Sequence, residues 1–368
     1  MLYGNKPVPC LLLLGFSALC AGQNPPPKPQ NATAAVLRAF DNHNIVMFGE
    51  YHACKQEYQW LRELVGTPEF ADRVDDIVVE FGNSLYQKSV DRYIAGEDIP
   101  LAQVQQAWRN VAGAIGPPSP VYESFYKAVR EANLKRRGKH QLRIVLGDPY
   151  ADWDAIKDRE DLGPFLANRD SWYTRVVKEE VLDKKRRALL IMGWGHFLRR
   201  KGPGGIEQQL LAAGASTWLI VFGTNVTGGY NDLDKRFDAW PLPVIVDLRA
   251  NWVGDLPAMP VLTGGAAPAT ALKLGDAADA LLYVAPRDAL TQLFMPRSEL
   301  EGTAYGKELD RRMTIQLGRT MNFLHDSAEG PLFERPRPSD GGPPPLPPPP
   351  KSMHDPLPPR PPSRQSAP

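Results

Sequence analysis

The sequence NIVMFGEYHACKQEYQWLREL, residues Asn44–Leu64, decides the fold of this chain. It begins with the apolar run Ile45–Phe48, which is typical of a parallel strand buried on both faces, and Gly49 interrupts that run. The segment that follows carries apolar residues at helical spacing and predicts an amphipathic helix packed on the sheet: Tyr58, Leu61 and Leu64. A strand that leads into a helix in this way is the repeating unit of an α/β protein.

Further apolar runs alternate with helical patterns along the chain. The additional predicted strands are Asp76–Phe81, Gln141–Gly147, Arg187–Met192, Thr217–Phe222, Val244–Leu248 and Leu281–Ala285. Among the helices, one is predicted over Leu162–Leu182 and another over Arg287–Phe294. The alternation from Asn44 to Gly223 predicts an α/β fold with a mostly parallel sheet and helices on both faces.

The N-terminus resembles a targeting segment. The apolar stretch Cys10–Ala21 is too short to span a bilayer comfortably, and the small residues after it favour a signal peptide over residues 1–22, cleaved after Gly22. A lipoprotein would carry its lipid on Cys20, but Leu19 stands where a small residue is expected. We therefore expect export to the periplasm or the outside without a lipid.

The remaining chain divides into three parts. Residues 23–33 are Pro-rich and read as a linker, residues 34–330 form a single α/β domain, and residues 331–368 form a Pro-rich tail that cannot bury a core and is expected to be disordered. The tract Pro343–Pro350 could contact an aromatic groove of a partner. No second stretch is long and apolar enough for a transmembrane helix.

Composition and motifs exclude several classes of function. The formal net charge of +1 gives no reason to expect a nucleic acid partner. The phosphate-binding glycine motifs, the Gly-x-Ser-x-Gly motif of serine hydrolases and the standard zinc motifs are all absent. After cleavage Cys54 is the only cysteine, so no intramolecular disulfide can form; Cys54 is either a buried small residue or, less commonly, a nucleophile or metal ligand.

Polar side chains stand just after several predicted strands, where open α/β sheets bind ligands. These candidates are Glu50, His52 and Glu57 after the first strand, Glu80 in the second, Asp148 after the third and His196 after the fourth, with Arg169 and Asp170 on a helix. A carboxylate such as Glu80 is costly to bury among apolar residues unless it is paired or binds a cation. The set suits either water activation by a His or Glu base beside an arginine, or a divalent metal held by nitrogen and oxygen.

Four short motifs occur in a recognisable order: Gly49-Glu50-Tyr-His52, Val79-Glu80-Phe-Gly82, Arg169-Asp170 and Gly193-Trp-Gly-His196. Together they resemble the superfamily that joins erythromycin esterases, ChaN-like haem-binding proteins and Tiki/TraB proteins. Two further segments are similar to its exported bacterial members, Leu146–Pro149 and Asp279–Tyr283.

This resemblance implies an α/β fold with its site at the carboxyl edge of the sheet. It implies that His52 activates water, that Glu50 and Glu80 orient it or bind substrate or metal, and that His196 is the second histidine. It leaves the arginine role open between Arg62, Arg109 and Arg169, of which we take Arg169 as the candidate. A metal would be held by His52, Glu80 and His196, whereas ChaN-like members bind haem. Glu57 stands where many relatives carry a further histidine.

The sequence thus predicts an exported hydrolase that cleaves an ester or amide of a small molecule or peptide. Its alternatives are a haem- or iron-binding uptake protein without turnover, and an interaction protein that presents its Pro-rich tail. A divalent metal or haem is the cofactor that either of the first two functions would use.

Overall fold

The computed structural model describes residues 26–113, 118–197, 199, 204–223, 237, 239–258, 272–286, 289–318 and 325–332. The predicted signal peptide, the first part of the linker and the Pro-rich tail beyond Leu332 lie outside these residues. Among the described residues, none of the helices has the length and apolarity that a membrane span requires.

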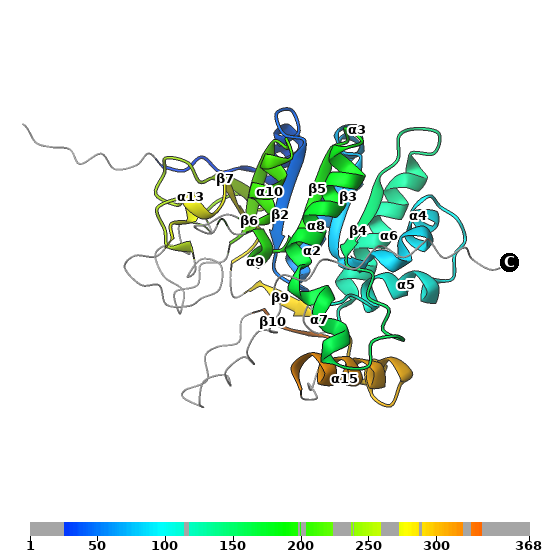
Figure 1. Ribbon diagram of the computed structural model, residues 1–368. Coiled ribbons are helices and arrows are strands. Elements are labelled where there is room, and N and C mark those ends of the chain that lie inside the picture. Colours follow the sequence, from blue (N-terminus) through cyan, green and yellow to red (C-terminus); the bar gives the residue numbers. More distant parts are fainter. Residues whose placement is uncertain are drawn as a thin grey trace, which may run out of the picture.

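The described residues form an eight-stranded sheet with the order β1-β7-β8-β6-β2-β5-β3-β4 (Figure 1). Its strands are β1 (Gln30–Asn31), β2 (Ile45–Glu50), β3 (Asp76–Asn83), β4 (Arg143–Asp148), β5 (Ala188–Gly193), β6 (Thr217–Phe222), β7 (Val244–Asp247) and β8 (Ala280–Tyr283). Every neighbouring pair is parallel except β1 with β7 and β7 with β8. The predicted α/β fold with a mostly parallel sheet is therefore confirmed.

Helices cover both faces of this sheet. They are α1 (Ala32–Ala39), α2 (Lys55–Gly66), α3 (Pro68–Arg73), α4 (Gln87–Ile94), α5 (Leu101–Arg109), α6 (Pro120–Lys135), α7 (Arg159–Ala167), α8 (Arg169–Val177), α9 (Trp194–Phe197), α10 (Ile206–Ala212), α13 (Leu274–Ala277), α14 (Arg297–Leu300) and α15 (Ala304–Leu317), with a 3-10 turn at Ser84–Tyr86 and a π turn at Lys178–Leu182.

Two apolar clusters lie on opposite faces of the sheet. Val46 and Phe48 of β2 belong to the cluster under α1 to α6, whereas Ile45 and Met47 belong to the cluster under α8, α9, α10 and α13. Successive side chains of a strand point to opposite faces, so a strand buried on both faces must be apolar at every position. This is why the residues Ile45–Phe48 of β2 are all apolar.

The strand order brings the carboxyl ends of β2, β5 and β3 together. Because β5 pairs with β2 on one side and with β3 on the other, the residues that follow β5 stand between the ends of the other two strands. A second, two-stranded ribbon of β9 (Thr291–Leu293) and β10 (Glu329–Pro331) lies at this end, below the sheet in Figure 1, together with α15.

Two predicted helices differ from the structure. The single helix expected over Leu162–Leu182 is broken at Asn168, whose φ of −124° and ψ of 27° lie outside the helical region, and a new helix begins at Arg169. The helix expected over Arg287–Phe294 is wrong, because Thr291–Leu293 forms β9. A three-residue strand leaves almost no periodicity, and its partner β10 lies far along the chain.

The segment expected to be a linker also contributes to the fold. Gln30 and Asn31 form β1 at the edge of the sheet, paired with β7, and helix α1 begins at Ala32 with the Asn31 side chain as its cap. The expected boundary at residue 33 therefore falls inside α1.

Candidate active site

Glu50 and His52 form a hydrogen-bonded pair at the end of β2. Glu50 is the last residue of the strand and is buried, and its Oε1 lies 2.9 Å from Nδ1 of His52 in the turn that follows. The hydroxyl of Tyr58, one turn into α2, donates to the other carboxylate oxygen. An ionised carboxylate only accepts hydrogen bonds, so the proton of the neutral ring is held on Nδ1 and Nε2 is the free nitrogen.

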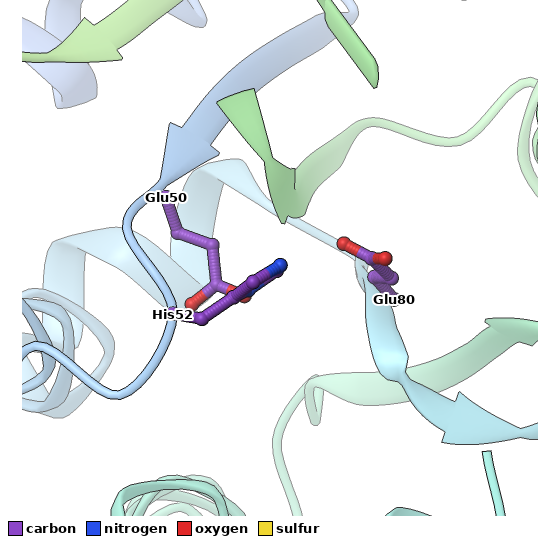
Figure 2. Close-up of side chains that lie close together, drawn as sticks. All are labelled: Glu50, His52 and Glu80. Atoms are coloured by element: carbon purple, nitrogen blue, oxygen red, sulfur yellow. The ribbon is translucent and has the colours of Figure 1, made fainter. Parts of the chain in front are cut away.

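The imidazole of His52 extends from β2 towards Glu80 (Figure 2). Gly193 makes this approach possible. A Cβ atom at Gly193 would lie 2.8 Å from Cε1 and 3.0 Å from Nε2 of His52, and 3.3 Å from Oε2 of Glu80. The end of β5 must therefore lack a side chain for the two groups to face each other.

Glu80 is the centre of a network of donors. Its carboxylate accepts the Gly193 amide at 2.7 Å, Nη2 of Arg169 at 3.1 Å and Nε2 of His196 at 3.2 Å. Burial alone would raise the pKa of Glu80, but the hydrogen bond from His196 and the charge of Arg169 hold it well below its usual range. Glu80 is thus ionised at neutral pH although it is buried.

Arg169 links the ends of β3 and β4. Its Nη2 lies 2.8 Å from Oδ1 of the buried Asp148, which also accepts the hydroxyl of Tyr173 at 3.0 Å. A Cβ at Gly113 would lie 2.4 Å from Nη1 of Arg169, so this backbone packs directly against the guanidinium. Burial raises the pKa of Asp148 more than Arg169 lowers it.

His196 lies between two carboxylates. Its Nδ1 is 2.6 Å from Oδ1 of Asp170, and its Nε2 contacts Glu80. Burial opposes a charge on this ring, but the hydrogen bonds to Asp170 and Glu80 raise its pKa to about 9. His196 is therefore a cation at neutral pH and donates from both nitrogens, which makes it a support for Glu80 rather than a base.

His52 is the histidine that can act as a base. Burial lowers the pKa of His52, but the hydrogen bond to Glu50 and the charge of that carboxylate raise it by more, so the net pKa lies above 6.5. The side chain remains one-third exposed, at 33%. The basicity of His52 is thus set by Glu50.

Two sequence candidates have other roles. Both carboxylate oxygens of Glu57 accept the backbone N–H of Tyr51, at 3.0 and 3.3 Å, so Glu57 holds the turn that carries His52. Burial and the charge of Glu50 raise the pKa of Glu57 well above its usual value. Cys54 is buried at the start of α2, and burial raises the pKa of its thiol, which disfavours a nucleophilic thiolate.

The three candidate arginines occupy different places. Nε of Arg62 contacts the backbone oxygen of Tyr58 on α2, and the Arg109 guanidinium stacks on the ring of Tyr305. Arg169 alone of these three contacts Glu80.

Sequence reasoning missed the polar contact of one tyrosine. The helical spacing places Tyr58 on the apolar face of its helix, yet its hydroxyl donates to Glu50, and Tyr122 packs against its ring at 5.5 Å between centroids. A buried tyrosine usually finds a hydrogen-bond partner for its hydroxyl. The sequence could therefore have predicted this contact, because Tyr58 lies on the inward face of a helix that follows a strand-end carboxylate. Gly193 belongs to the Gly-Trp-Gly-His196 motif, but its closeness to His52 depends on the strand order.

A metal would find donor atoms here, although most are already engaged. The described residues whose donor atoms all lie within 4.8 Å of one another are Glu50, His52 and Glu80; His196, expected in the metal set, contacts only Glu80 of these. Both oxygens of Glu50 already accept hydrogen bonds, and Glu80 already faces the positive charges of Arg169 and His196. A divalent cation would have to displace these contacts or share a carboxylate with two cations, so the residues fit an acid–base site better than a metal centre.

Comparison with known proteins gives similarity in structure alone. No protein-family model matches the chain, and no curated protein matches it. Similar solved structures include a protein from Bacillus cereus (13% identity, TM-score 0.44, 70% of this chain and 94% of that one) and an erythromycin esterase in its open conformation (11%, 0.43, 69% and 93%). A third is the haem-binding ChaN of Campylobacter jejuni (12%, 0.31, 54% and 88%).

Erythromycin esterases and ChaN-like proteins, the families that the motifs resemble, are thus both among the solved structures similar to this chain. The identities are low and these TM-scores lie below 0.5, so the chemistry of the site has to be derived from this chain's own residues.

Proposed function

We propose that this chain is an exported hydrolase in which His52 activates a water molecule to cleave an ester or amide of a small molecule or peptide. The observation that carries the proposal is the pair formed by Nδ1 of His52 and Oε1 of Glu50, which leaves Nε2 directed at the site. A buried carboxylate behind an imidazole fixes the tautomer and ring orientation and stabilises the imidazolium that forms.

In this reaction Nε2 of His52 removes a proton from water while the water oxygen bonds to the carbonyl carbon. The carbonyl π electrons move to its oxygen, and the tetrahedral intermediate then expels the alcohol or amine, which receives the proton from His52. Glu80, kept ionised by Arg169 and His196, accepts a hydrogen bond from the water and directs it to the carbonyl. A base positioned in this way contributes about 10²–10⁴-fold to the rate.

The test is turnover of the full chain on a panel of small esters, lactones and peptide amides. We expect His52→Ala to lower kcat/KM on any active substrate by at least about 10²-fold while the circular dichroism spectrum stays unchanged. The matched control is His140→Ala, because His140 is half exposed and contacts Asp75 at the opposite end of the sheet. Full activity in His52→Ala would refute the assignment.

The same preparation distinguishes the alternatives. Elemental analysis and a chelator test whether turnover depends on a divalent metal, and a porphyrin absorption band that disappears in His52→Ala would favour haem binding instead. Export is tested by locating the full chain after expression with and without residues 1–22.

A further inference from the structure

The turn that carries His52 is held by a segment far away in the sequence. The side-chain amide of Gln292, on β9, donates to the backbone oxygen of His52 at 3.1 Å. The backbone N–H of Leu293 donates to the oxygen of Ala53 at 3.1 Å, and Cys54 forms an isolated bridge with Gln292. The ribbon therefore contacts three consecutive residues of the turn.

The conformation of this turn needs such support. Ala53 has φ +64°, the left-handed region that costs a residue with a side chain about 1 kcal/mol or more. On the other side of the turn, Glu57 accepts the N–H of Tyr51. Strained backbone persists where its surroundings fix it, and here α2 and β9 do so from two sides.

The ribbon is itself anchored to α2. The Gln56 side chain donates to the oxygen of Ala289 at 2.7 Å and accepts the N–H of Thr291 at 3.0 Å. Lys55 contacts Glu329 of β10 at 2.8 Å, and the Thr291 hydroxyl donates to the same carboxylate at 2.6 Å. These contacts fix the position of Gln292 relative to the end of β2.

We propose that Gln292 is a positioning residue for the reaction, setting the direction of the His52 imidazole through the backbone of its turn. This inference rests on the proposed role of His52. If the turn relaxed by about 1 Å, Nδ1 would leave hydrogen-bond distance of Glu50 and Nε2 would no longer face Glu80, a misplacement that costs about 10²-fold in rate.

The experiment compares the full chain with Gln292→Ala and Gln292→Glu. The first removes the amide, and the second keeps its length but places a carboxylate against the His52 carbonyl. The matched control is Gln103→Ala, because the exposed amide of Gln103 on α5 contacts only Ser89 of α4 among the hydrogen bonds of the described residues. We expect both Gln292 variants to lower kcat by about 10- to 100-fold with KM nearly unchanged, and the control to match the parent.

Two readouts need no substrate. The ring N–H shared by His52 and Glu50 should give a downfield proton resonance, assigned by its loss in His52→Ala and weakened or moved upfield in both Gln292 variants. Carbethoxylation of His52 by diethyl pyrocarbonate, followed by peptide mass, should become several-fold faster in these variants because the ring leaves its place beside Gly193.

Unchanged carbethoxylation and an unchanged resonance in both folded variants would overturn the inference. A parent chain without turnover, combined with altered carbethoxylation in the variants, would contradict the proposed function and leave the positioning role standing. If a Gln292 variant does not fold, Lys55→Gln is used instead, because it removes the contact with Glu329 and loosens the ribbon from outside the site. We then expect a smaller increase in the rate of His52 carbethoxylation.

Discussion

Nδ1 of His52 lies 2.9 Å from Oε1 of Glu50, a residue only two positions earlier in the chain. In a continuous strand these side chains would point the same way and extend side by side. Here the strand ends at Glu50 and the backbone turns through the left-handed Ala53, so that the imidazole lies across the carboxylate. The pair is therefore a product of the turn as much as of the Gly-Glu-x-His motif.

Gly193→Ala should disable the site without unfolding the sheet. The new methyl group would lie within 3.0 Å of the His52 ring and push it away from Glu80, so we expect kcat/KM to fall by about 10²-fold. Gly195→Ala is the control, because a Cβ there meets nothing within 4 Å. Equal activity in the two variants would contradict the close approach of His52 and Glu80.

Hydrolysis should rise with pH through the pKa of His52. In the proposed reaction the neutral ring is the base. The hydrogen bond to Glu50 raises its pKa above 6.5, so the inflection of kcat/KM is expected above that pH. Glu50→Gln removes the negative charge that stabilises the imidazolium, which moves the inflection to lower pH and reduces the maximal rate. A pH–rate profile of both proteins checks this; an inflection that stays in place would show that Glu50 does not set the basicity.

Stability should fall in mildly alkaline solution because of His196. The pKa of this residue is about 9 in the folded chain and about 6.5 when unfolded, so its stabilising contribution is complete below pH 6.5 and is lost as the pH rises to 9. The contribution is on the order of 3 kcal/mol. Urea unfolding between pH 6 and 9.5 measures it, and His196→Gln should flatten most of the slope.

Two tyrosines of α6 should respond oppositely to loss of the hydroxyl. Among the described residues, the buried hydroxyl of Tyr122 has no hydrogen-bond partner of normal geometry, whereas that of Tyr126 donates to the Phe81 oxygen at 3.2 Å. Tyr122→Phe should raise the free energy of unfolding by about 1 kcal/mol, and Tyr126→Phe should lower it by a similar amount. Denaturant unfolding of both variants measures these changes in the free energy of unfolding. A destabilised Tyr122→Phe would indicate that the Tyr122 hydroxyl has a hydrogen-bond partner.

The sequence predicted the core strands of the sheet well because each is a dense apolar run. Ile45–Phe48 and Thr217–Phe222 could be recognised without any partner, since burial on both faces requires apolar residues at every position. The ribbon strand Thr291–Leu293 could not be recognised, because three partly exposed residues become a strand only by pairing with Glu329–Pro331.

The candidate site could likewise be predicted only in part from the sequence. The sequence determined which polar residues follow the strands, and therefore that Glu50, His52, Glu80 and His196 would lie at one edge of the sheet. Only the tertiary structure decided that β5 lies between β2 and β3, and that Gly193 consequently stands beside both His52 and Glu80. It also decided that Arg169 begins a new helix and reaches Glu80, and that Gln292 reaches the turn of His52. Local patterns record the burial of each residue, but strand order and long-range contacts depend on the free energy of the whole packed chain, which no short stretch of sequence carries.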